Sequence, residues 1–344
     1  MARIALDAMG GDFAPRATIA GALHALAELA DDHTVQLVGQ TQVIENQLAE
    51  LLKADFPEGA RLRDRISVVD APDTISMSDK PTAALRNGSH NPMSVGLRLQ
   101  VDHASDAFVS AGNTGAQMAA SALLLGRHAG LTRPAIATLF PTALRPIVVI
   151  DSGANVDCSA DELVQFAWLG SIYAESALGR ENPVVGLLSI GEEKEKGNAA
   201  TKAAHPLFKT AGFNFQGNVE GRDLPAGASD RGPIDVVVCD GFVGNVVLKF
   251  YEAVMPMIVA LLTADPAFDN ETLEAALGPL DSTSYGGAPL LGVKGVSIIC
   301  HGNSSPKAIK NAVKVAVRAV ETKVNERIEQ RLMRSANAVS GRVA

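Results

Sequence analysis

The chain has 344 residues, of which 47% are hydrophobic and 20% are charged, and its formal net charge is −8. This length is enough for one large α/β domain or two moderate ones with a sizeable core, and the composition is neither disordered nor fibrous. The negative charge disfavours a general nucleic-acid binder, which would need an excess of basic residues. The three cysteines, Cys158, Cys239 and Cys300, have no CxxC spacing, so we expect neither a disulfide framework nor a zinc site.

The N-terminus carries Asp7 and no apolar run, so the pattern predicts no signal peptide. The longest conspicuous apolar run, residues 254–262, is shorter than the roughly 20 residues that a membrane-spanning helix needs. Together with the sparse cysteines, these features predict a protein of the reducing cytosol.

Short β-branched runs alternate with longer amphipathic stretches along the chain. The predicted strands are Arg3–Asp7, Thr34–Val38, Ile66–Asp70, Asp106–Ser110, Ala135–Phe140, Pro146–Ile150, Val184–Ser189, Ile234–Asp240 and Val296–Cys300. The predicted helices lie near 15–30, 41–53, 80–101, 114–127, 161–178, 198–211, 243–263 and 306–334. This alternation predicts βαβ units and a mostly parallel, doubly wound sheet. No Ser/Gly-rich linker or repeat divides the chain, so we expect a single domain over residues 1–344.

Several predicted strands end in loops rich in glycine and small polar residues. These loops are Asp7–Asp12, Ser110–Gly115, Asp151–Asn155, Ser189–Asn198, Asp240–Asn245 and His301–Pro306. In an open parallel sheet the carboxyl ends of the strands share one edge, and ligands bind there. Glycine lets the backbone approach a ligand, and a following helix offers free N–H groups to an anion. The loops therefore predict a site for phosphate or a developing oxyanion, although any one of them alone is equally consistent with an ordinary N-capped turn.

The usual cofactor motifs do not accompany these loops. The sequence has no GxGxxG after a strand, no GxxxxGK(S/T) and no GxSxG. It also has no HExxH and no clustered Cys and His that would suggest a catalytic metal. We therefore expect no nucleotide cofactor and no metal.

Two further segments contain residues suited to chemistry. Cys300 and His301 are adjacent, but neighbouring strand residues point to opposite faces, so we expect Cys300 in the core and His301 facing the site. The glycine-flanked charged segment Gly191–Gly197 has two interpretations. It is either a solvated loop or a mobile loop that brings Lys194 or Lys196 to a phosphate, for which a compact ammonium is suited.

Seven segments also carry a resemblance to a known family. They are LDAMGGDFAP (6–15), VSAGNTGA (109–116), IDSGANVD (150–157), LSIGEEKEKGN (188–198), VVCDGFVGNVVLK (237–249), YGGAPLLGVKG (285–295) and HGNSSPKAIKNA (301–312). These segments closely resemble the phosphate acyltransferase family of bacterial phospholipid synthesis, the acyl-ACP:phosphate transacylases. The resemblance spans nearly the whole chain, in the family's order.

The resemblance implies a three-layer α/β/α fold similar to phosphotransacetylases and to isocitrate and isopropylmalate dehydrogenases. It implies formation of acyl-phosphate from a fatty acyl thioester on acyl carrier protein and inorganic phosphate, without a cofactor. It also implies a cytoplasmic homodimer, open to peripheral membrane contact, which passes acyl-phosphate to a membrane glycerol-3-phosphate acyltransferase. No nucleic-acid partner is expected.

The match is weakest over residues 251–284. In the family this region forms a variable helical hairpin at the dimer and is implicated in membrane contact. Here Pro256 falls within the predicted helix, where proline favours a kink. Two interpretations stay open, a helix packed on the dimer partner and a membrane-facing tip.

The reaction implied by the resemblance assigns roles to the loop residues. Phosphate must attack a thioester carbonyl, so positioning and charge stabilisation should dominate. We expect Lys194 or Lys196 to neutralise phosphate or the oxyanion, and Asn245 to donate a hydrogen bond. His301 is expected either to orient phosphate or to protonate the leaving sulfur.

The remaining expected phosphate- and substrate-binding residues come from the same loops. They are Asp7, Gly10, Gly11, Asn113, Thr114, Gly115, Asn198, Asp240, Gly244, Asn303 and Ser304. Because ionised Asp7 and Asp240 would repel phosphate, we expect them to orient lysine, histidine or loop amides instead.

A row of basic residues lies on the final predicted helix. Lys307, Lys310, Lys314 and Arg318 follow one another at spacings that place them on one face. This face is either a docking surface for the acidic carrier protein or an ordinary solvated face.

Three rival functions remain open from the sequence. The first is a phosphotransacetylase that acts on short acyl-CoA, and the second is a metal- and NADP-dependent decarboxylating dehydrogenase of related fold. The third is a non-catalytic protein that binds an acyl carrier or phosphate.

Overall fold

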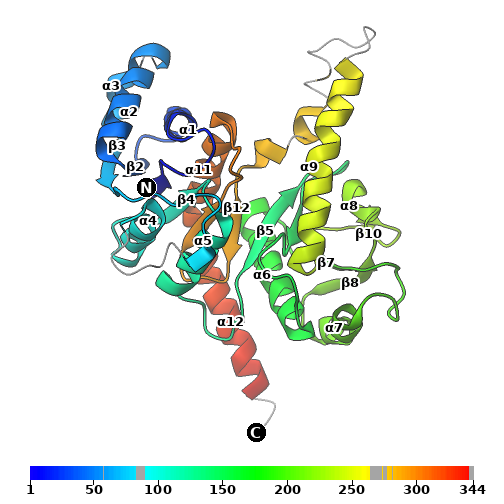
Figure 1. The fold of residues 1–344 in the computed structure, drawn as a ribbon. Coiled ribbons are helices and arrows are strands. Elements are labelled where there is room, and N and C mark those ends of the chain that lie inside the picture. The colour runs from blue at the N-terminus through cyan, green and yellow to red at the C-terminus, as the bar shows by residue number, and fades with distance from the viewer. Residues whose placement is uncertain (57, 83–89, 264–272, 274–276, 281, 341–344) are drawn as a thin grey trace. The chain divides into compact units, whose positions relative to one another are not determined.

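The computed structural model describes residues 1–56, 58–82, 90–263, 273, 277–280 and 282–340 (Figure 1). The chain divides into two compact units. Unit 1 consists of Met1–Ala129 and Tyr285–Glu329, and unit 2 of Gly130–Ser284 and Gln330–Ala344. The expectation of a single domain over residues 1–344 stays a prediction.

Unit 1 is built on a mostly parallel sheet. Its strands, in spatial order, are β3 (Ile66–Asp70), β2 (Thr34–Gly39), β1 (Arg3–Asp7), β4 (Ala107–Ser110), β13 (Val296–Ile299) and β12 (Ala288–Leu291). Only β12 is antiparallel to its neighbour within this unit. Because β1, β2, β4 and β13 run in one direction, the loops that follow them begin at the same edge of the sheet.

Helices cover both faces of this sheet. They are α1 (Arg16–Glu28), α2 (Thr41–Asp55), α3 (Gly59–Arg63), α4 (Pro92–Val101), α5 (Thr114–Leu124) and α11 (Pro306–Glu321). Successive side chains of β4 point to opposite faces of the sheet. Ala107 and Val109 join the core shared with α1 and α11, whereas the Phe108 ring lies against Gly96 of α4.

Unit 2 contains a five-stranded stretch of sheet with helices on both faces (Figure 1). Its order is β5 (Ala135–Phe140), β6 (Ile147–Ile150), β11 (Val236–Val238), β7 (Val184–Leu188) and β8 (Asn214–Val219), with β5 antiparallel to β6. Val236 packs on Gly170 of α6 (Ala160–Leu178), which lies on the same face as α7 (Ala199–Thr210). Val237 belongs to the opposite core, which contacts α9 (Gly241–Thr263) and α8 (Asp223–Ala226).

The remaining described elements are short or terminal. They are the hairpin of β9 (Ala228–Ser229) and β10 (Gly232–Pro233), the 3-10 helices Gly278–Leu280 and Ser282–Tyr285, and α12 (Val324–Ser340). Parts of the predicted hairpin over 251–284 fall on 264–272, 274–276 and 281, which lie outside the described residues.

The nine predicted strands are all present, with ends that agree within two residues, and the mostly parallel α/β fold is confirmed. Two helix predictions were wrong in their bounds. Of the helix expected over 80–101, residues 83–89 lie outside the described residues, and α4 begins at Pro92, where Asn91 caps it by accepting a hydrogen bond from the Ser94 amide. The helix expected over 306–334 ends at Glu321, because Lys323 adopts a left-handed conformation with φ of 54° before α12 begins.

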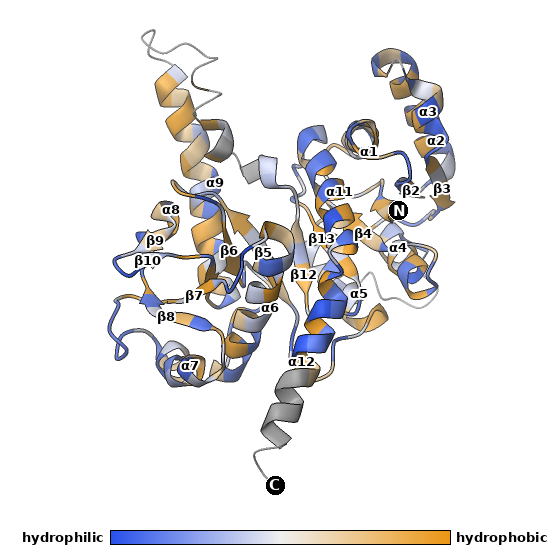
Figure 2. Ribbon diagram, turned by 180° about the vertical axis from the view of Figure 1, so that it is seen from behind, coloured by the Kyte–Doolittle hydropathy of each residue, from blue (hydrophilic) through white to orange (hydrophobic). Residues whose placement is uncertain are grey.

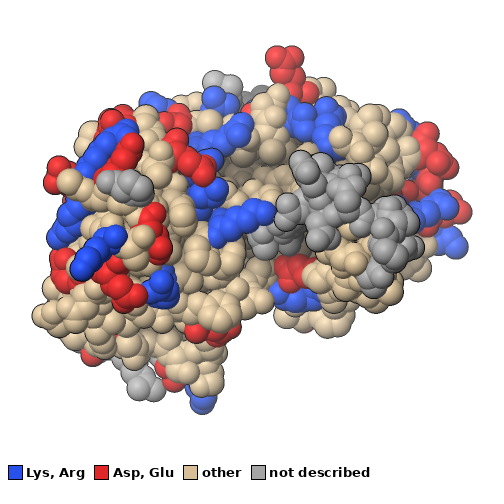
Figure 3. Space-filling model, turned by 90° about the horizontal axis from the view of Figure 1, so that it is seen from above, with Lys and Arg blue, Asp and Glu red and all other residues tan. Residues whose placement is uncertain are grey.

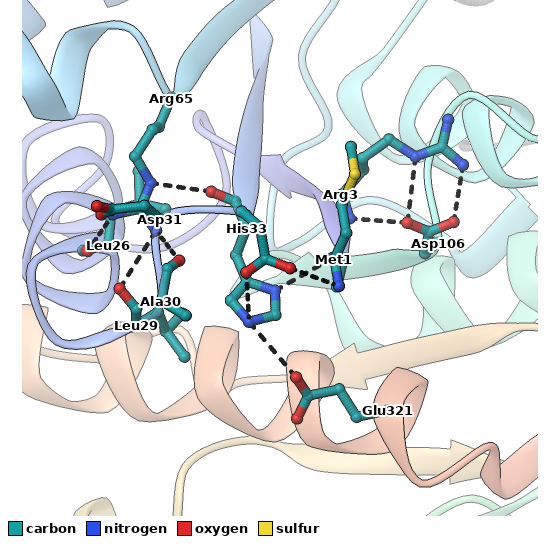
Figure 4. A network of polar contacts seen from close by, with 12 residues as sticks. Met1, Arg3, Leu26, Leu29, Ala30, Asp31, His33, Arg65, Asp106 and Glu321 are labelled. Atoms are coloured by element: carbon teal, nitrogen blue, oxygen red, sulfur yellow. Dashed lines mark hydrogen bonds and ion pairs between the residues drawn. The ribbon is translucent and has the colours of Figure 1, made fainter.

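A polar network lies at the edge of the unit 1 sheet where β1 and β4 begin, opposite the loops that follow these strands (Figure 4). The buried Arg65 guanidinium donates to the carbonyls of Leu26 and Ala30 over 2.7 and 2.6 Å, which satisfies the last turn of α1. Arg3 donates to Asp106 over 2.8 Å and thereby joins β1 to the start of β4. These charges stabilise the fold and leave the carboxyl edge for the candidate site.

Replacing Gly21 with alanine should destabilise unit 1. A Cβ at this position would lie 2.5 Å from Ile309 Cβ and 2.9 Å from the Pro306 carbonyl oxygen. Overpacking costs about 1–3 kcal/mol and helix propensity offsets about 1 kcal/mol, so we expect a net loss of up to about 2 kcal/mol in the free energy of unfolding. Urea unfolding measures this. The exposed control Ala27→Leu on the same helix should stay within about 0.5 kcal/mol of the parent, and an equally stable Gly21→Ala variant would contradict the packing.

Candidate functional site

In unit 1 the loops that follow β1, β4 and β13 meet. The Asp12 amide donates to the Gly302 carbonyl over 2.7 Å. A Cβ on Gly10 would lie 2.5 Å from Asp7 Oδ2 and 2.8 Å from the Gly112 amide nitrogen, so only glycine fits between these loops. The structure therefore brings together the predicted segments Asp7–Asp12, Ser110–Gly115 and His301–Pro306.

Asp7 organises two of these loops from a buried position. Ser110 Oγ donates to Asp7 Oδ2 over 2.7 Å, and the Met9 amide donates to Oδ1 over 3.0 Å. The Gly112 amide in turn donates to Ser110 Oγ over 3.0 Å. Burial raises the pKa of Asp7 to about 6, although the bonds from Ser110 and from the Met9 and Gly10 amides lower it. Asp7 thus holds loop amides, as expected, and the sequence reasoning missed Ser110.

Asn113 has both ends of its side chain engaged within the protein. Its Oδ1 accepts from the Ala116 amide over 2.9 Å and caps α5. Its Nδ2 donates to the carbonyls of Met77 and Asp79 over 3.0 and 2.9 Å. Asn113 therefore fixes residues 76–79 over the start of α5. A Cβ on Gly115 would lie 2.9 Å from Pro81 Cγ, so this segment also packs on the helix N-terminus.

The other predicted residues of unit 1 lie at the surface of this cluster. Thr114, His301 and Asn303 are exposed. The Ser304 amide donates to the His301 carbonyl over 3.0 Å and closes the turn before α11. The prediction that Cys300 is a core residue is confirmed, since it is buried and burial raises the pKa of its thiol to about 12.

Unit 2 repeats the arrangement around a second buried carboxylate, Asp151, at the end of β6. Its oxygens accept from the amides of Ala154 and Asn155 over 2.9 and 2.7 Å and from Asn155 Nδ2 over 2.9 Å. Burial raises the pKa of Asp151 despite these bonds. The Gly241 amide donates to the Asn155 carbonyl over 2.7 Å, and a Cβ on Gly244 would overlap the Asp151 carbonyl oxygen. Asp151 was not among the predicted site residues.

The loop that follows β11 is capped by Asp240. Its Oδ1 accepts from the Val243 amide over 2.8 Å at the start of α9. Asn245, on the first turn of α9, is exposed and lies beside the Asp151 loop, where a Cβ on Gly153 would be 3.5 Å from Asn245 Oδ1. Asp240 therefore orients the Val243 amide at the start of α9.

The lysine-containing loop follows β7. Lys194 and Lys196 are both exposed, and Lys194 Nζ lies 3.6 Å from Glu195 Oε1. Gly197 has φ of 108°, which favours glycine, and it leads into Asn198. Asn198 caps α7 by accepting from the Thr201 amide over 2.9 Å.

A pocket of about 160 Å³ lies where β7 and β11 end and α7 and α9 begin. Its apolar lining includes Leu187, Leu188 and Val243, and its polar lining includes Ser189, Asn198, Thr201 and Asp240. Within the described part of the chain, the buried Ser189 Oγ has no hydrogen-bond partner. The pocket thus suits a small, mostly apolar group with one polar atom.

The predicted residues fall into two groups, one in each unit. Unit 1 holds Asp7, Gly10, Gly11, Asn113, Thr114, Gly115, His301, Asn303 and Ser304, and unit 2 holds Lys194, Lys196, Asn198, Asp240, Gly244 and Asn245. That the two groups form one site stays a prediction. Within the described ranges, no three His, Cys, Asp or Glu residues gather as a metal site would require.

The fold defined by these units is that of phosphotransacylases. A phosphotransacetylase from Streptococcus pyogenes has a TM-score of 0.61 and 16% identity, with 93% of this chain and 94% of that chain covered. A branched-chain phosphotransacylase from Enterococcus faecalis V583 has a TM-score of 0.59 and 14% identity, with 93% and 99% covered. At these identities the likeness shows the fold alone.

Sequence comparison is more specific. The family model described as "Fatty acid synthesis protein" matches residues 2–327. A protein named phosphate acyltransferase from Desulforamulus reducens is 46% identical over 93% of this chain and 94% of its own length. Another of that name from Desulfitobacterium hafniense (strain Y51) is 46% identical over 97% and 98%. The chain therefore belongs to the phosphate acyltransferase family, a family of transferases.

The raised pKa of Asp7 should make the free energy of unfolding depend on pH. The folded-state pKa of about 6 lies above the ordinary value of about 3.9, so ionisation of Asp7 costs stability as the pH rises from about 4 to 6. Asp7→Asn removes this cost. Relative to the parent, the variant should therefore gain about 2 kcal/mol in the free energy of unfolding between about pH 4.5 and about pH 7.5.

Denaturant unfolding of both proteins at the two pH values measures this gain, and the comparison cancels the other titrating groups. A difference between the two proteins that does not change with pH would contradict the buried, ionisable environment of Asp7.

Proposed function

We propose that this chain transfers a fatty acyl group from acyl carrier protein to inorganic phosphate, and that the acyl-phosphate feeds glycerol-3-phosphate acylation in phospholipid synthesis. The observation that carries this proposal is the gathering of glycine-rich loops and helix N-termini at the carboxyl ends of the strands in each unit. Such loops suit a phosphate and a developing oxyanion. The relatives named phosphate acyltransferase support the same reaction.

The chemistry is a substitution at a thioester carbonyl. A phosphate oxygen forms a bond to the carbonyl carbon, the carbonyl oxygen carries negative charge in the intermediate, and the carbon–sulfur bond breaks with the electron pair leaving on sulfur. The thiolate departs without a strong general acid. Positioning of two reactants and stabilisation of the oxyanion therefore supply most of the rate enhancement.

The exposed ammonium groups of Lys194 and Lys196 supply the positive charge that this reaction needs. Both are exposed on a loop that glycine flanks on either side, and either can neutralise phosphate or the oxyanion. His301, exposed at the end of β13, orients phosphate or gives a proton to the leaving sulfur. Asn245 donates a hydrogen bond from the first turn of α9.

Asp7, Asp240 and Asn113 contribute through the backbone rather than by contact with phosphate. The carboxylates accept hydrogen bonds from loop and helix amides, and the Asn113 amide group is engaged with the carbonyls of residues 76–79. These residues set the shape of the loops. Thr114, Asn198, Asn303 and Ser304 offer side-chain groups to substrate, and Gly10, Gly11, Gly115 and Gly244 allow the loops to approach it closely.

One assay tests the proposed reaction. Acyl carrier protein thioester and phosphate are incubated with the chain, and free thiol and hydroxylamine-reactive acyl-phosphate are measured together. Both signals should appear with phosphate and disappear without it. Thiol release that is independent of phosphate would contradict the proposal and indicate a thioesterase.

A phosphotransacetylase that uses short acyl-CoA is the second candidate, because solved structures of that name share the fold. Comparing turnover with palmitoyl carrier protein, palmitoyl-CoA and acetyl-CoA separates the two. A preference for acetyl-CoA would overturn the fatty acyl assignment.

Helix α9 favours a homodimer as the working form of the enzyme. Phe242, Val246, Phe250, Met257 and Leu261 are exposed along the helix, and Figure 2 shows its second half extending beyond the strands of its own unit. By length and composition, α9 is also the one helix among the described residues that could cross a bilayer, which is weak evidence. We assign this stripe of exposed apolar side chains to contact with a partner subunit. The enzyme is then cytoplasmic, and it contacts the membrane and a membrane glycerol-3-phosphate acyltransferase only peripherally.

The basic face of α11 is a weaker candidate for carrier docking than its sequence suggests. Lys310 and Lys314 both pair with Glu28 of α1, over 2.7 and 2.8 Å. Figure 3 shows acidic and basic side chains interspersed on the surface seen from above, rather than a broad field of one sign. Interspersed charge steers an acidic partner less than a basic patch does.

Lys194→Ala and Lys196→Ala, made separately, should leave at least one variant with little turnover. Loss of one stabilising cation in a transition state typically costs about tenfold to a thousandfold in kcat. Steady-state assays with varied phosphate measure this. Two variants with parental turnover would contradict the lysine role, and Lys209→Ala at the end of α7 serves as the control.

Phe250→Lys combined with Leu261→Lys should break the homodimer, because two charges would enter its apolar contact. Light scattering after gel filtration should report a monomer with parental circular dichroism. A dimer that persists while flotation with zwitterionic vesicles is lost would assign these apolar side chains to the membrane instead.

A further inference from the structure

The loop that carries Lys194 and Lys196 is held at its base through its backbone. The Glu193 carbonyl accepts from Asn218 Nδ2 over 2.8 Å, and the Glu192 carbonyl accepts from Arg231 Nη2 over 3.4 Å. Both donors come from outside the loop, since Asn218 lies on β8 and Arg231 in the β9–β10 turn. The loop is therefore tied to β8 directly before its two lysines.

Arg231 makes this connection with both ends of its guanidinium. Its Nη1 donates to the carbonyls of Gln216 and Asn218 over 3.2 and 3.1 Å. Its Nη2 reaches the Glu192 carbonyl and, over 3.3 Å, Glu192 Oε2. A planar fork with several fixed donors can serve these acceptors at once, whereas the single ammonium of a lysine cannot.

The edge strand β8 is shaped to receive this side chain. Gly217 has φ of 116°, and a Cβ there would lie 2.6 Å from Arg231 Nη1. The register of β7 and β8 also shifts at Gly186, which marks a local irregularity in the pairing. The carbonyls of an edge strand need partners, and Arg231 supplies them here while linking the strand to the loop.

The turn that carries Arg231 is itself anchored. The Arg231 amide donates to Ser229 Oγ over 3.1 Å, and Gln216 Nε2 donates to both Ser229 Oγ and the Gly232 carbonyl. In Figure 1 and Figure 2 the hairpin lies beside β8. The backbone that carries the guanidinium is therefore fixed, which is required of a residue that positions another segment.

Arg231 also balances the charge of the loop. Glu192 is half-buried, and its carboxylate lies 3.3 Å from Arg231 Nη2 and 3.6 Å from Arg222 Nη2. Without Arg231, only Arg222 would neutralise this carboxylate, which precedes Lys194 by two residues and would repel a phosphate more strongly.

We propose that Arg231 is a positioning residue that clamps the base of the loop to β8 and so fixes where Lys194 and Lys196 meet the anionic reactant. The consequence for catalysis rests on the proposed function, whereas the clamp itself does not. Displacing a catalytic group by about 1 Å can cost about a hundredfold in rate, so a loosened loop should lower activity although both lysines remain.

Hydrogen exchange of residues 191–197 tests the clamp without any substrate. Arg231→Lys keeps the positive charge and Arg231→Gln removes it, but neither can bridge the three carbonyls. Exchange at these amides should become at least about tenfold faster in both variants, while the core strand β11 keeps parental protection. Arg222→Gln is the matched control, because Arg222 contacts Glu192 through side chains alone, and its exchange should stay parental.

The same variants are then assayed for acyl transfer. Both should lose about tenfold to a hundredfold in kcat/KM for phosphate, and Arg231→Lys should not restore it. Parental exchange in both variants would overturn the clamp. Faster exchange with parental kcat/KM would overturn its catalytic consequence. A parent protein that forms no acyl-phosphate would overturn the proposed function and leave the exchange result standing.

Discussion

A buried carboxylate at the end of a strand shapes the candidate site in each unit. Asp7 ends β1 and Asp151 follows β6, and each accepts hydrogen bonds from the amides of the loop that comes next. Burying a charged group is costly unless it is hydrogen-bonded, so the loops must fold around these oxygens. The glycines at positions 10 and 244 follow from the same constraint, since a side chain at either would collide with the aspartate residue or its loop.

This constraint explains a division of labour among the polar residues. The aspartates accept hydrogen bonds from backbone amides. Asn113 accepts one from the start of α5 and donates to the carbonyls of segment 76–79. The exposed side chains include Lys194, Lys196, His301 and Asn245. In the proposed phosphorolysis these groups would meet the anionic reactant and the oxyanion, while the buried carboxylates keep the loops in shape without contributing negative charge at the surface.

Much of this organisation could be predicted from the sequence. Buried parallel strands are apolar runs, and β1, β4 and β11 were found because hydrophobicity and β-branching mark them locally. The edge strand β8 was missed because Asn214, Gln216 and Gly217 interrupt any such run. The full engagement of Asn113 could not be foreseen, because its partners lie more than thirty residues away in the chain. Ser110 and Arg231 were missed for the same reason, since their partners are set by the fold.

The proposed reaction requires inorganic phosphate to be the nucleophile that cleaves the thioester. Phosphate labelled with heavy oxygen at every position, supplied with unlabelled acyl carrier protein thioester, tests this directly by mass spectrometry of the product. Attack by phosphate predicts acyl-phosphate that retains every labelled oxygen and an unlabelled carbonyl. Unlabelled free fatty acid, together with thiol release that does not depend on phosphate, would instead show that water attacks. The assignment of the loops to phosphate would then be wrong.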